Sequence, residues 1–165
     1  MTDSGIPLQR WTESVTSALS EVAASSLSVE MTVEGVELAS PATLCGSLVA
    51  LVSGRNVVCV GFSSRPEGCR QLAGAMLGLE GADIDGLSHD DVRDSIGELV
   101  NILAGAVKTK LSGEDAELTL GLPIYFEGFF EGDSHSRSCY VPCRLGETTG
   151  VLTLLLAAGS SRAAA

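Results

Sequence analysis

One long helical pattern constrains the fold of this chain more than any other feature. From about Asp90 to Leu111 apolar residues recur at intervals of three and four, the spacing of one face of an α-helix. Ser88 and Asp91 before it have the spacing of a capping box, which marks the start of a helix. The residues that share the apolar stripe are Val92, Ile96, Leu99, Leu103 and Val107. Such a stripe is stable only against a second apolar layer of the same domain.

The flanking segments predict that this second layer is a sheet. Residues 29–33 alternate between apolar and polar side chains, and residues 44–52 and 56–62 are apolar runs of strand length joined by a short turn at residues 53–55. We therefore expect three successive antiparallel strands, the last two forming a hairpin. Residues 116–120, 136–145 and 151–157 predict three more strands, with a connection through Pro123 and a hairpin turn at residues 146–150.

Two further helices are predicted before the long one. The first spans Pro7 to Ala24, where apolar residues form one stripe, and the second starts at Ser64 as N-cap, with Pro66 in its first turn, and stops near Gly81. Residues 81–87 are expected to form a loop. The order of elements predicts an α+β fold with helices packed on a largely antiparallel sheet. The 165 residues fit one domain over 1–165, with residues 1–6 and 159–165 as frayed tails.

Net charge and apolar runs exclude several classes of partner. The formal net charge of −11 would repel a nucleic-acid backbone and an anionic membrane surface. The first ten residues lack a basic segment followed by an apolar run, and no apolar stretch approaches the roughly 20 residues of a membrane span. We therefore expect a cytoplasmic protein without a nucleic-acid or membrane partner.

The cysteines and histidines do not form a motif for metal binding or catalysis. The five cysteines, an odd number without regular spacing, are typical of reduced thiols. His135, Cys139 and Cys143 could be three zinc ligands, but the motif lacks a fourth ligand and its cysteines stand in an extended segment, so we predict no metal site. His89 lies at a helix start, where capping explains it, and His135 in a polar loop. Three phenylalanines are expected in the core or a dimer contact: Phe126, Phe129 and Phe130.

The side of the long helix opposite its apolar stripe is polar. At 100° per residue it collects Asp94, Glu98, Asn101, Gly105 and Lys108. A polar stripe is usually only a solvated face. Two residues argue against that interpretation here, because asparagine is a poor helix former and a glycine inside a helix costs roughly 1 kcal/mol relative to alanine. The missing side chain at Gly105 would clear space beside Asn101.

The segment Glu98-Leu99-Val100-Asn101, continued to Gly105, resembles the E-x-x-N…G signature of the CheC/CheX phosphatase family, and CheX in particular. Asp94 to Gly97 before it and Leu120 to Pro123 after it also fit that family. In the order of its elements the resemblance extends from about Pro7 to Ala157, and it implies a CheC/CheX-like fold.

The resemblance also implies a function. Proteins of this type hydrolyse the aspartyl phosphate of response-regulator receiver domains in chemotaxis and related two-component pathways. By similarity, Glu98 would pair with a receiver lysine and Asn101 would orient the attacking water, with Asp94, Gly105 and Lys108 also contacting the partner. The Mg²⁺ would belong to the receiver, so no cofactor is expected on this chain.

Further expectations concern assembly and the alternatives. CheC-like members often carry two motifs, whereas this chain has one, and the resemblance implies a homodimer. One alternative is a non-catalytic module of the same fold, like the relatives in the flagellar switch. Another is a protein that binds a receiver only to sense its state. The sequence leaves these alternatives open.

Overall fold

The computed structural model describes residues 5–37, 43–128 and 131–157. Helices and strands follow one another along this part of the chain as predicted, with α3 and β5 as additions. In order they are α1 (Leu8–Ser26), β1 (Met31–Thr32), β2 (Cys45–Val52), β3 (Val57–Ser64), α2 (Pro66–Leu77), α3 (Ala82–Asp85), α4 (His89–Lys110), β4 (Thr119–Leu120), β5 (Ile124–Glu127), β6 (Arg137–Leu145) and β7 (Thr148–Leu156).

The strands form one antiparallel sheet of seven strands in the order β1-β6-β7-β3-β2-β4, with β5 also paired to β2. Both predicted hairpins are confirmed: β2 pairs with β3 from Cys45–Ser64 to Val52–Val57, and β6 pairs with β7. The C-terminal hairpin therefore extends the N-terminal one, because β7 lies directly beside β3. This confirms the predicted α+β class with helices on an antiparallel sheet.

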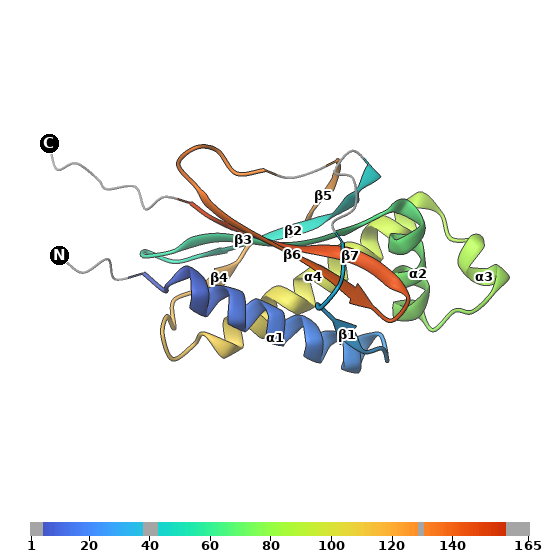
Figure 1. Ribbon diagram of the computed structural model, residues 1–165, viewed down its shortest axis with the longest axis horizontal. Helices are drawn as coiled ribbons and strands as arrows, with labels where there is room; N and C mark the ends of the chain where they lie inside the picture. The colour runs from blue at the N-terminus through green and yellow to red at the C-terminus, as the bar shows by residue number, and fades with distance from the viewer. Residues whose placement is uncertain (1–4, 38–42, 129–130, 158–165) are drawn as a thin grey trace, which may run out of the picture.

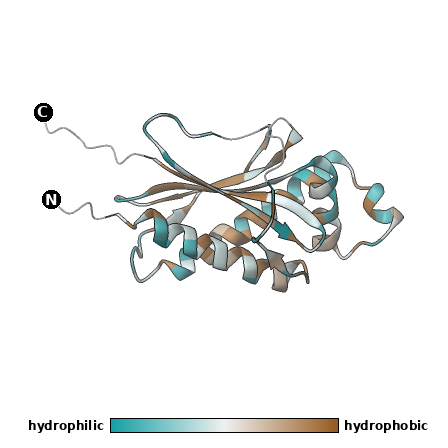
Figure 2. Ribbon diagram, viewed as in Figure 1, coloured by the Kyte–Doolittle hydropathy of each residue, from teal (hydrophilic) through white to brown (hydrophobic). Residues whose placement is uncertain are grey.

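Helices α1, α2 and α4 lie on one face of the sheet, with α4 beneath β2 and flanked by α1 and α2, whereas α3 lies beside α2 and beyond the sheet (Figure 1). Hydrophobic residues follow the central strands and the helix faces turned toward them (Figure 2). Trp11 of α1, Phe62 of β3 and Leu99 of α4 are among the largest side chains that are fully buried there. On the other face of the sheet, Gly132 lies close to the side chain of Leu155.

Three predictions about the sheet and the termini were incomplete or wrong. β1 pairs with β6 at the far edge of the sheet and not with β2, because alternation identifies a strand but not its neighbour. β5 was predicted only as a connection after Pro123. Ile6 is not part of a frayed tail, since its side chain is buried and its N–H donates to Asn56 Oδ1 at 3.2 Å. Residues 1–4, 158–165, Phe129 and Phe130 lie outside the described residues.

The start and end of the second helix also differ from the prediction. Ser64 is the last residue of β3, and Arg65 is the N-cap of α2, so Pro66 is the first helical residue. The helix ends at Leu77 because Gly78 adopts a left-handed conformation with φ of 67°. The expected loop after it contains the one-turn helix α3.

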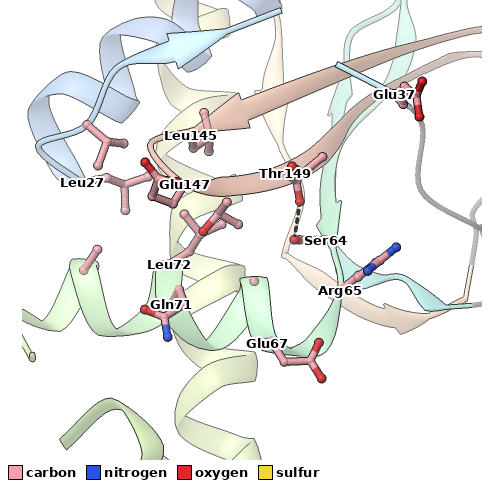
Figure 3. A pocket seen from close by; sticks show the side chains of 14 residues that line it. Leu27, Glu37, Ser64, Arg65, Glu67, Gln71, Leu72, Leu145, Glu147 and Thr149 are labelled. Carbon is pink, nitrogen blue, oxygen red and sulfur yellow. Dashed lines mark hydrogen bonds between the residues drawn. The ribbon is translucent and has the colours of Figure 1, made fainter. Parts of the chain in front are cut away.

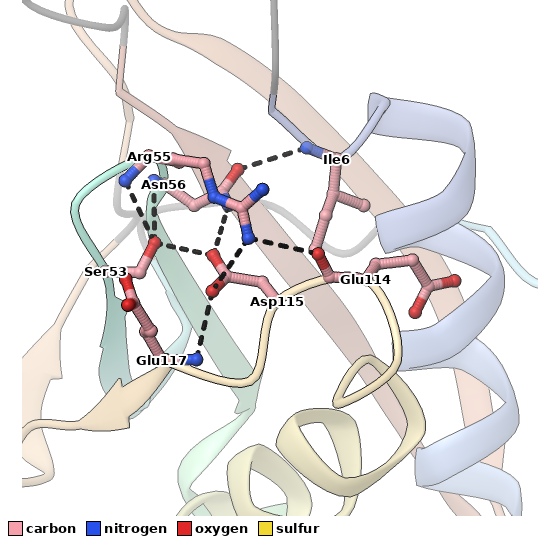
Figure 4. A network of polar contacts seen from close by, with 7 residues as sticks. All are labelled: Ile6, Ser53, Arg55, Asn56, Glu114, Asp115 and Glu117. Atoms are coloured by element: carbon pink, nitrogen blue, oxygen red, sulfur yellow. Dashed lines mark hydrogen bonds and ion pairs between the residues drawn. The ribbon is translucent and has the colours of Figure 1, made fainter.

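The buried carboxylate of Asp115, in the loop after α4, binds this loop to the β2–β3 hairpin (Figure 4). The fully buried side chain of Asp115 accepts hydrogen bonds from Ser53 Oγ at 2.6 Å and Asn56 Nδ2 at 2.7 Å, and Arg55 Nη2 lies 3.4 Å away. Burial alone would raise the pKa of Asp115, but these hydrogen bonds, a further one from the Glu117 N–H and the Arg55 charge hold it below its usual value. The charged network therefore holds the loop after α4 against the β2–β3 hairpin.

Candidate functional site

The start of α4 is set by its own sequence. Ser88 is the N-cap, its Oγ accepts from the Asp91 N–H, and the Asp91 carboxylate accepts from the Ser88 N–H, each at 3.1 Å. The Ser88 hydroxyl and N–H lower the pKa of Asp91. The predicted capping box is thus confirmed. The charges at both ends of α4 also interact favourably with the helix dipole: acidic residues lie in the first turn, and Lys108 and Lys110 lie in the last turn.

The predicted apolar stripe holds α4 against the rest of the molecule. Its members are 0–7% exposed: Val92, Ile96, Leu99, Leu103 and Val107. Fully burying a side chain of this size stabilises a fold by roughly 1.5–3 kcal/mol. The rotation of α4 about its axis is therefore fixed, and so is the direction in which its opposite side points.

The opposite side of α4 forms a polar ridge, which we define as Asp94, Glu98, Asn101, Gly105 and Lys108. Asp94 and Glu98 are exposed, and the other three are partly exposed. Glu98 and Asn101 are neighbours one helical turn apart, so one carboxylate and one amide are presented side by side. The prediction that these five residues share one accessible face is confirmed.

The polar side chains on this ridge are not bound to other described residues. Neither the Glu98 carboxylate nor the Asn101 amide has a side-chain hydrogen bond or ion pair to a described residue. A Cβ atom placed on Gly105 would meet no described atom within 4 Å. The side chains are thus available to an external partner, and Gly105 leaves open space beside them.

A short apolar segment lies along the ridge. A Cβ on Gly97 of α4 would lie 3.6 Å from Pro123 Cβ, so the loop before β5 packs next to the residue that precedes Glu98. Leu122 and Ile124 on either side of this proline are 84% and 60% exposed. Sequence reasoning did not identify them as surface residues. The available signal was a leucine held between Gly121 and Pro123, outside any strand pattern.

The ridge is not part of an enclosed pocket. Two larger hollows lie elsewhere on the described structure, and neither is lined by a ridge residue. Figure 3 shows the larger one, about 870 Å³, between α2 and the β6–β7 hairpin, where the Ser64 hydroxyl donates to the Thr149 carbonyl at 2.6 Å. A small substrate would have to be enclosed to be oriented. The exposed ridge is instead suited to a macromolecular surface.

The histidines and cysteines provide no metal centre in the described part of the chain, where no group of three metal-ligating side chains comes together. His135 is exposed, as expected. His89 is the first residue of α4 and makes an edge-to-face contact with Tyr125, with 5.8 Å between ring centroids. Across the described residues, no helix is long and apolar enough to cross a membrane.

Comparison with protein families matches the central part of the chain. The model of the family described as "Chemotaxis phosphatase CheX" matches residues 46–142, a span that includes all of α4 and most of β2 and β6. A search of curated proteins finds no match.

Comparison with solved structures gives matches along nearly the whole chain. The chemotaxis protein CheX from Vibrio vulnificus is 15% identical, with a TM-score of 0.70 over 88% of this chain and 95% of that one. A CheX–CheY–BeF₃–Mg²⁺ complex from Borrelia burgdorferi gives 20% identity and a TM-score of 0.64, over 89% and 96%. The FliM middle domain from H. pylori gives 10% and 0.61, over 92% and 94%. At these identities the matches show a shared fold.

Proposed function

The chain belongs to the CheX family of chemotaxis phosphatases, and from this premise we propose that the ridge of α4 removes the phosphoryl group from the aspartate of a response-regulator receiver domain. The observation that carries the proposal is the pair of an exposed Glu98 and a partly exposed Asn101, which lie side by side and whose side chains have no partner among the described residues. The solved complex of the Borrelia burgdorferi relative contains CheY, a receiver-type partner for a protein of this fold.

The reaction requires only one contribution from this chain, the positioning of a water molecule. A phosphorylated receiver holds its own Mg²⁺ and acyl phosphate, so the missing component is a water molecule positioned in line with the bond that breaks. The Asn101 amide oxygen can accept a hydrogen bond from that water and orient it toward phosphorus. The water oxygen bonds to phosphorus as the P–O bond to the receiver aspartate breaks; the aspartate carboxylate is released, and the inorganic phosphate carries the protons of the water. Asn101 orients the nucleophile and takes no proton.

Glu98 has a different role in this proposal. Its exposed carboxylate would pair with a receiver lysine and so place Asn101 over the phosphoryl group. An exposed ion pair contributes little by itself, about 0–1 kcal/mol, but a pair desolvated at an interface contributes more. Asp94 and Lys108 extend the contact along the ridge, and Gly105 allows the receiver backbone to approach.

Leu122 is the apolar part of this docking surface. It lies next to Pro123, which packs at Gly97 beside the ridge, and 84% of its surface is exposed. Burying an exposed leucine on a partner is favourable at roughly 25 cal/mol per Å² of apolar surface. Polar groups on the ridge and one apolar anchor beside it resemble the usual composition of a protein interface.

The experiment that tests the proposal measures the decay of a phosphorylated receiver with and without the protein. Asn101→Ala should abolish most of the acceleration, by about 100-fold, because a misplaced reactant costs on that order. Glu98→Ala should chiefly raise the concentration of protein needed for half-maximal acceleration. Glu13→Ala serves as a matched control, since Glu13 is an exposed helical carboxylate on α1, away from the ridge.

A second candidate function is a non-catalytic binding module. The match to the FliM middle domain shows that the fold also occurs in a protein of the FliM type. If the wild-type chain binds phosphorylated receivers but accelerates the decay of none, that candidate replaces the phosphatase. Equal activity of wild type and Asn101→Ala would instead show that the catalytic group lies elsewhere.

We further propose that the protein acts in the cytoplasm as a homodimer. The resemblance to CheX, whose members form homodimers, supports this proposal. The molar mass in solution, measured by light scattering, tests this.

A further inference from the structure

Two cysteines that the proposed phosphatase reaction does not use lie against each other. Cys45 is the first residue of β2, Cys69 lies in α2, and their sulfur atoms are 3.5 Å apart. The Cys69 thiol is also within hydrogen-bonding distance of the Cys45 carbonyl oxygen, at 3.4 Å, and of the Ser64 carbonyl oxygen, at 3.8 Å. We call these two residues the thiol pair. Nothing in their 24-residue spacing indicated that the fold would bring them together.

The surroundings shift the pKa values of the two thiols in opposite directions. A hydrogen bond from Cys69 is the main cause that lowers the pKa of Cys45, and the Tyr125 hydroxyl and the charge of His89 lower it further. Burial and the charge of Glu127 act in the opposite direction and raise it. The same hydrogen bond, together with burial, raises the pKa of Cys69. Cys45 is therefore the more readily ionised thiol of the two and the better nucleophile.

The thiol pair borders a hollow, although Cys45 is only 5% exposed and Cys69 is fully buried. Both cysteines line a hollow of about 750 Å³ between the start of α2 and the start of α4, together with His89 and Tyr125. Arg65 and Arg70 also line it, as do Glu67 and Glu127, so the lining carries charges of both signs. A molecule the size of hydrogen peroxide can therefore approach Cys45 from the hollow, with Cys69 next to the attacked sulfur.

The other cysteines have different surroundings. Burial raises the pKa of Cys59, and it raises that of Cys143 to about 12. Cys59 pairs with Leu155 in the sheet and Cys139 pairs with Leu154. Neither has a sulfur–sulfur contact to a described residue, although both are more exposed than the thiol pair. They provide internal references for nonspecific oxidation.

We infer that Cys45 and Cys69 form a peroxide-sensitive dithiol site, a modification site separate from the ridge. In the first step the Cys45 thiolate attacks one oxygen of hydrogen peroxide, the O–O bond breaks, and a sulfenic acid and hydroxide form. In the second step the Cys69 sulfur attacks the sulfenic sulfur, a disulfide forms, and water leaves with the Cys69 proton. Two thiols are oxidised and one peroxide is reduced. A dithiol reductant reverses the change.

The test uses the purified, reduced full chain and stoichiometric hydrogen peroxide. We expect two of the five thiols to disappear together, with loss of two hydrogens in the intact mass and recovery after dithiothreitol. Trypsin should release residues 11–55 joined to residues 56–70, because cleavage is blocked between Arg65 and Pro66. The second peptide also contains Cys59, so the map is repeated with Cys59→Ser, which should retain the link.

Two variants assign the roles within the thiol pair. Cys69→Ser should leave a sulfenic acid at Cys45 that a dimedone probe traps, and Cys45→Ser should form no disulfide at all. Cys139→Ser is the control and should behave as wild type. The inference is overturned if the wild-type pair stays reduced while Cys59 and Cys139 oxidise, or if the joined peptides are lost in Cys59→Ser. Both outcomes are read from proteins that keep the thiol pair, so they do not depend on the folding of its variants or on phosphatase activity.

Discussion

Replacing Gly105 by alanine should make the protein more stable and less active. The residue lies inside α4, and its φ angle is not among the positive ones. A Cβ atom there meets no described atom within 4 Å. The substitution therefore gains the helix propensity of alanine without a clash, about 0.8–1.0 kcal/mol. For a chain of this length that raises the melting temperature by roughly 2–4 °C.

The same methyl group should obstruct the receiver. In the proposed complex the space beside Asn101 is filled by the partner, and an added methyl in a packed contact costs about 1–3 kcal/mol. Since each 1.36 kcal/mol is a factor of ten in rate, the apparent kcat/KM for receiver dephosphorylation should fall by about 5- to 160-fold. Stability and activity would then change in opposite directions after one substitution.

Thermal unfolding followed by circular dichroism and the decay of a phosphorylated receiver measure the two effects. Ser20→Ala is the control, because Ser20 is exposed on α1 and its replacement also raises helix propensity. It should stabilise the protein slightly and leave the decay unchanged. If Gly105→Ala lowers the melting temperature, the space assigned to that position is wrong. If it raises the melting temperature and the decay is unaffected, Gly105 lies outside the docking surface.

Three further predictions concern the surroundings of the ridge. Leu122→Ser should raise KM for the receiver but change the free energy of unfolding by less than about 0.5 kcal/mol, because the side chain is 84% exposed; steady-state kinetics and urea unfolding check both. Leu103→Ala should cost about 3 kcal/mol in urea unfolding, since that side chain is fully buried beneath the ridge; an unchanged midpoint would contradict the packing of α4. Asp115→Ala should cost about 3 kcal/mol at neutral pH because it leaves Ser53 and Asn56 without their acceptor. The folded-state pKa of Asp115 lies below the ordinary value of 3.8, so this stabilisation is present above that value and is lost as the pH falls through the folded-state pKa; the difference between wild type and Asp115→Ala, measured against pH, should shrink there.

The long helix and its two faces could be predicted from the sequence because both depend on residues close together in the chain. The capping box of Ser88 and Asp91 specifies where α4 starts, and a 3.6-residue period separates the stripe of Leu99 from the ridge of Asn101. The β2–β3 hairpin was predictable for the same reason, since three residues separate its apolar runs.

Contacts between segments that are distant in the chain could not be predicted from local sequence patterns. Alternation identified residues 29–33 as extended, but only the fold places Met31 beside Leu145 and not beside β2. The exposure of Leu122 likewise depends on how Pro123 packs against Gly97.

The sequence by itself determined a long helix with one buried and one polar side, and a motif on that polar side which indicates the family. Only the tertiary structure decided that the ridge is open to a partner, and that Cys45 and Cys69 come into contact across 24 residues. The physical reason is that periodicity specifies which side of an element is buried. The neighbour against which that side is buried depends on how all the layers pack together.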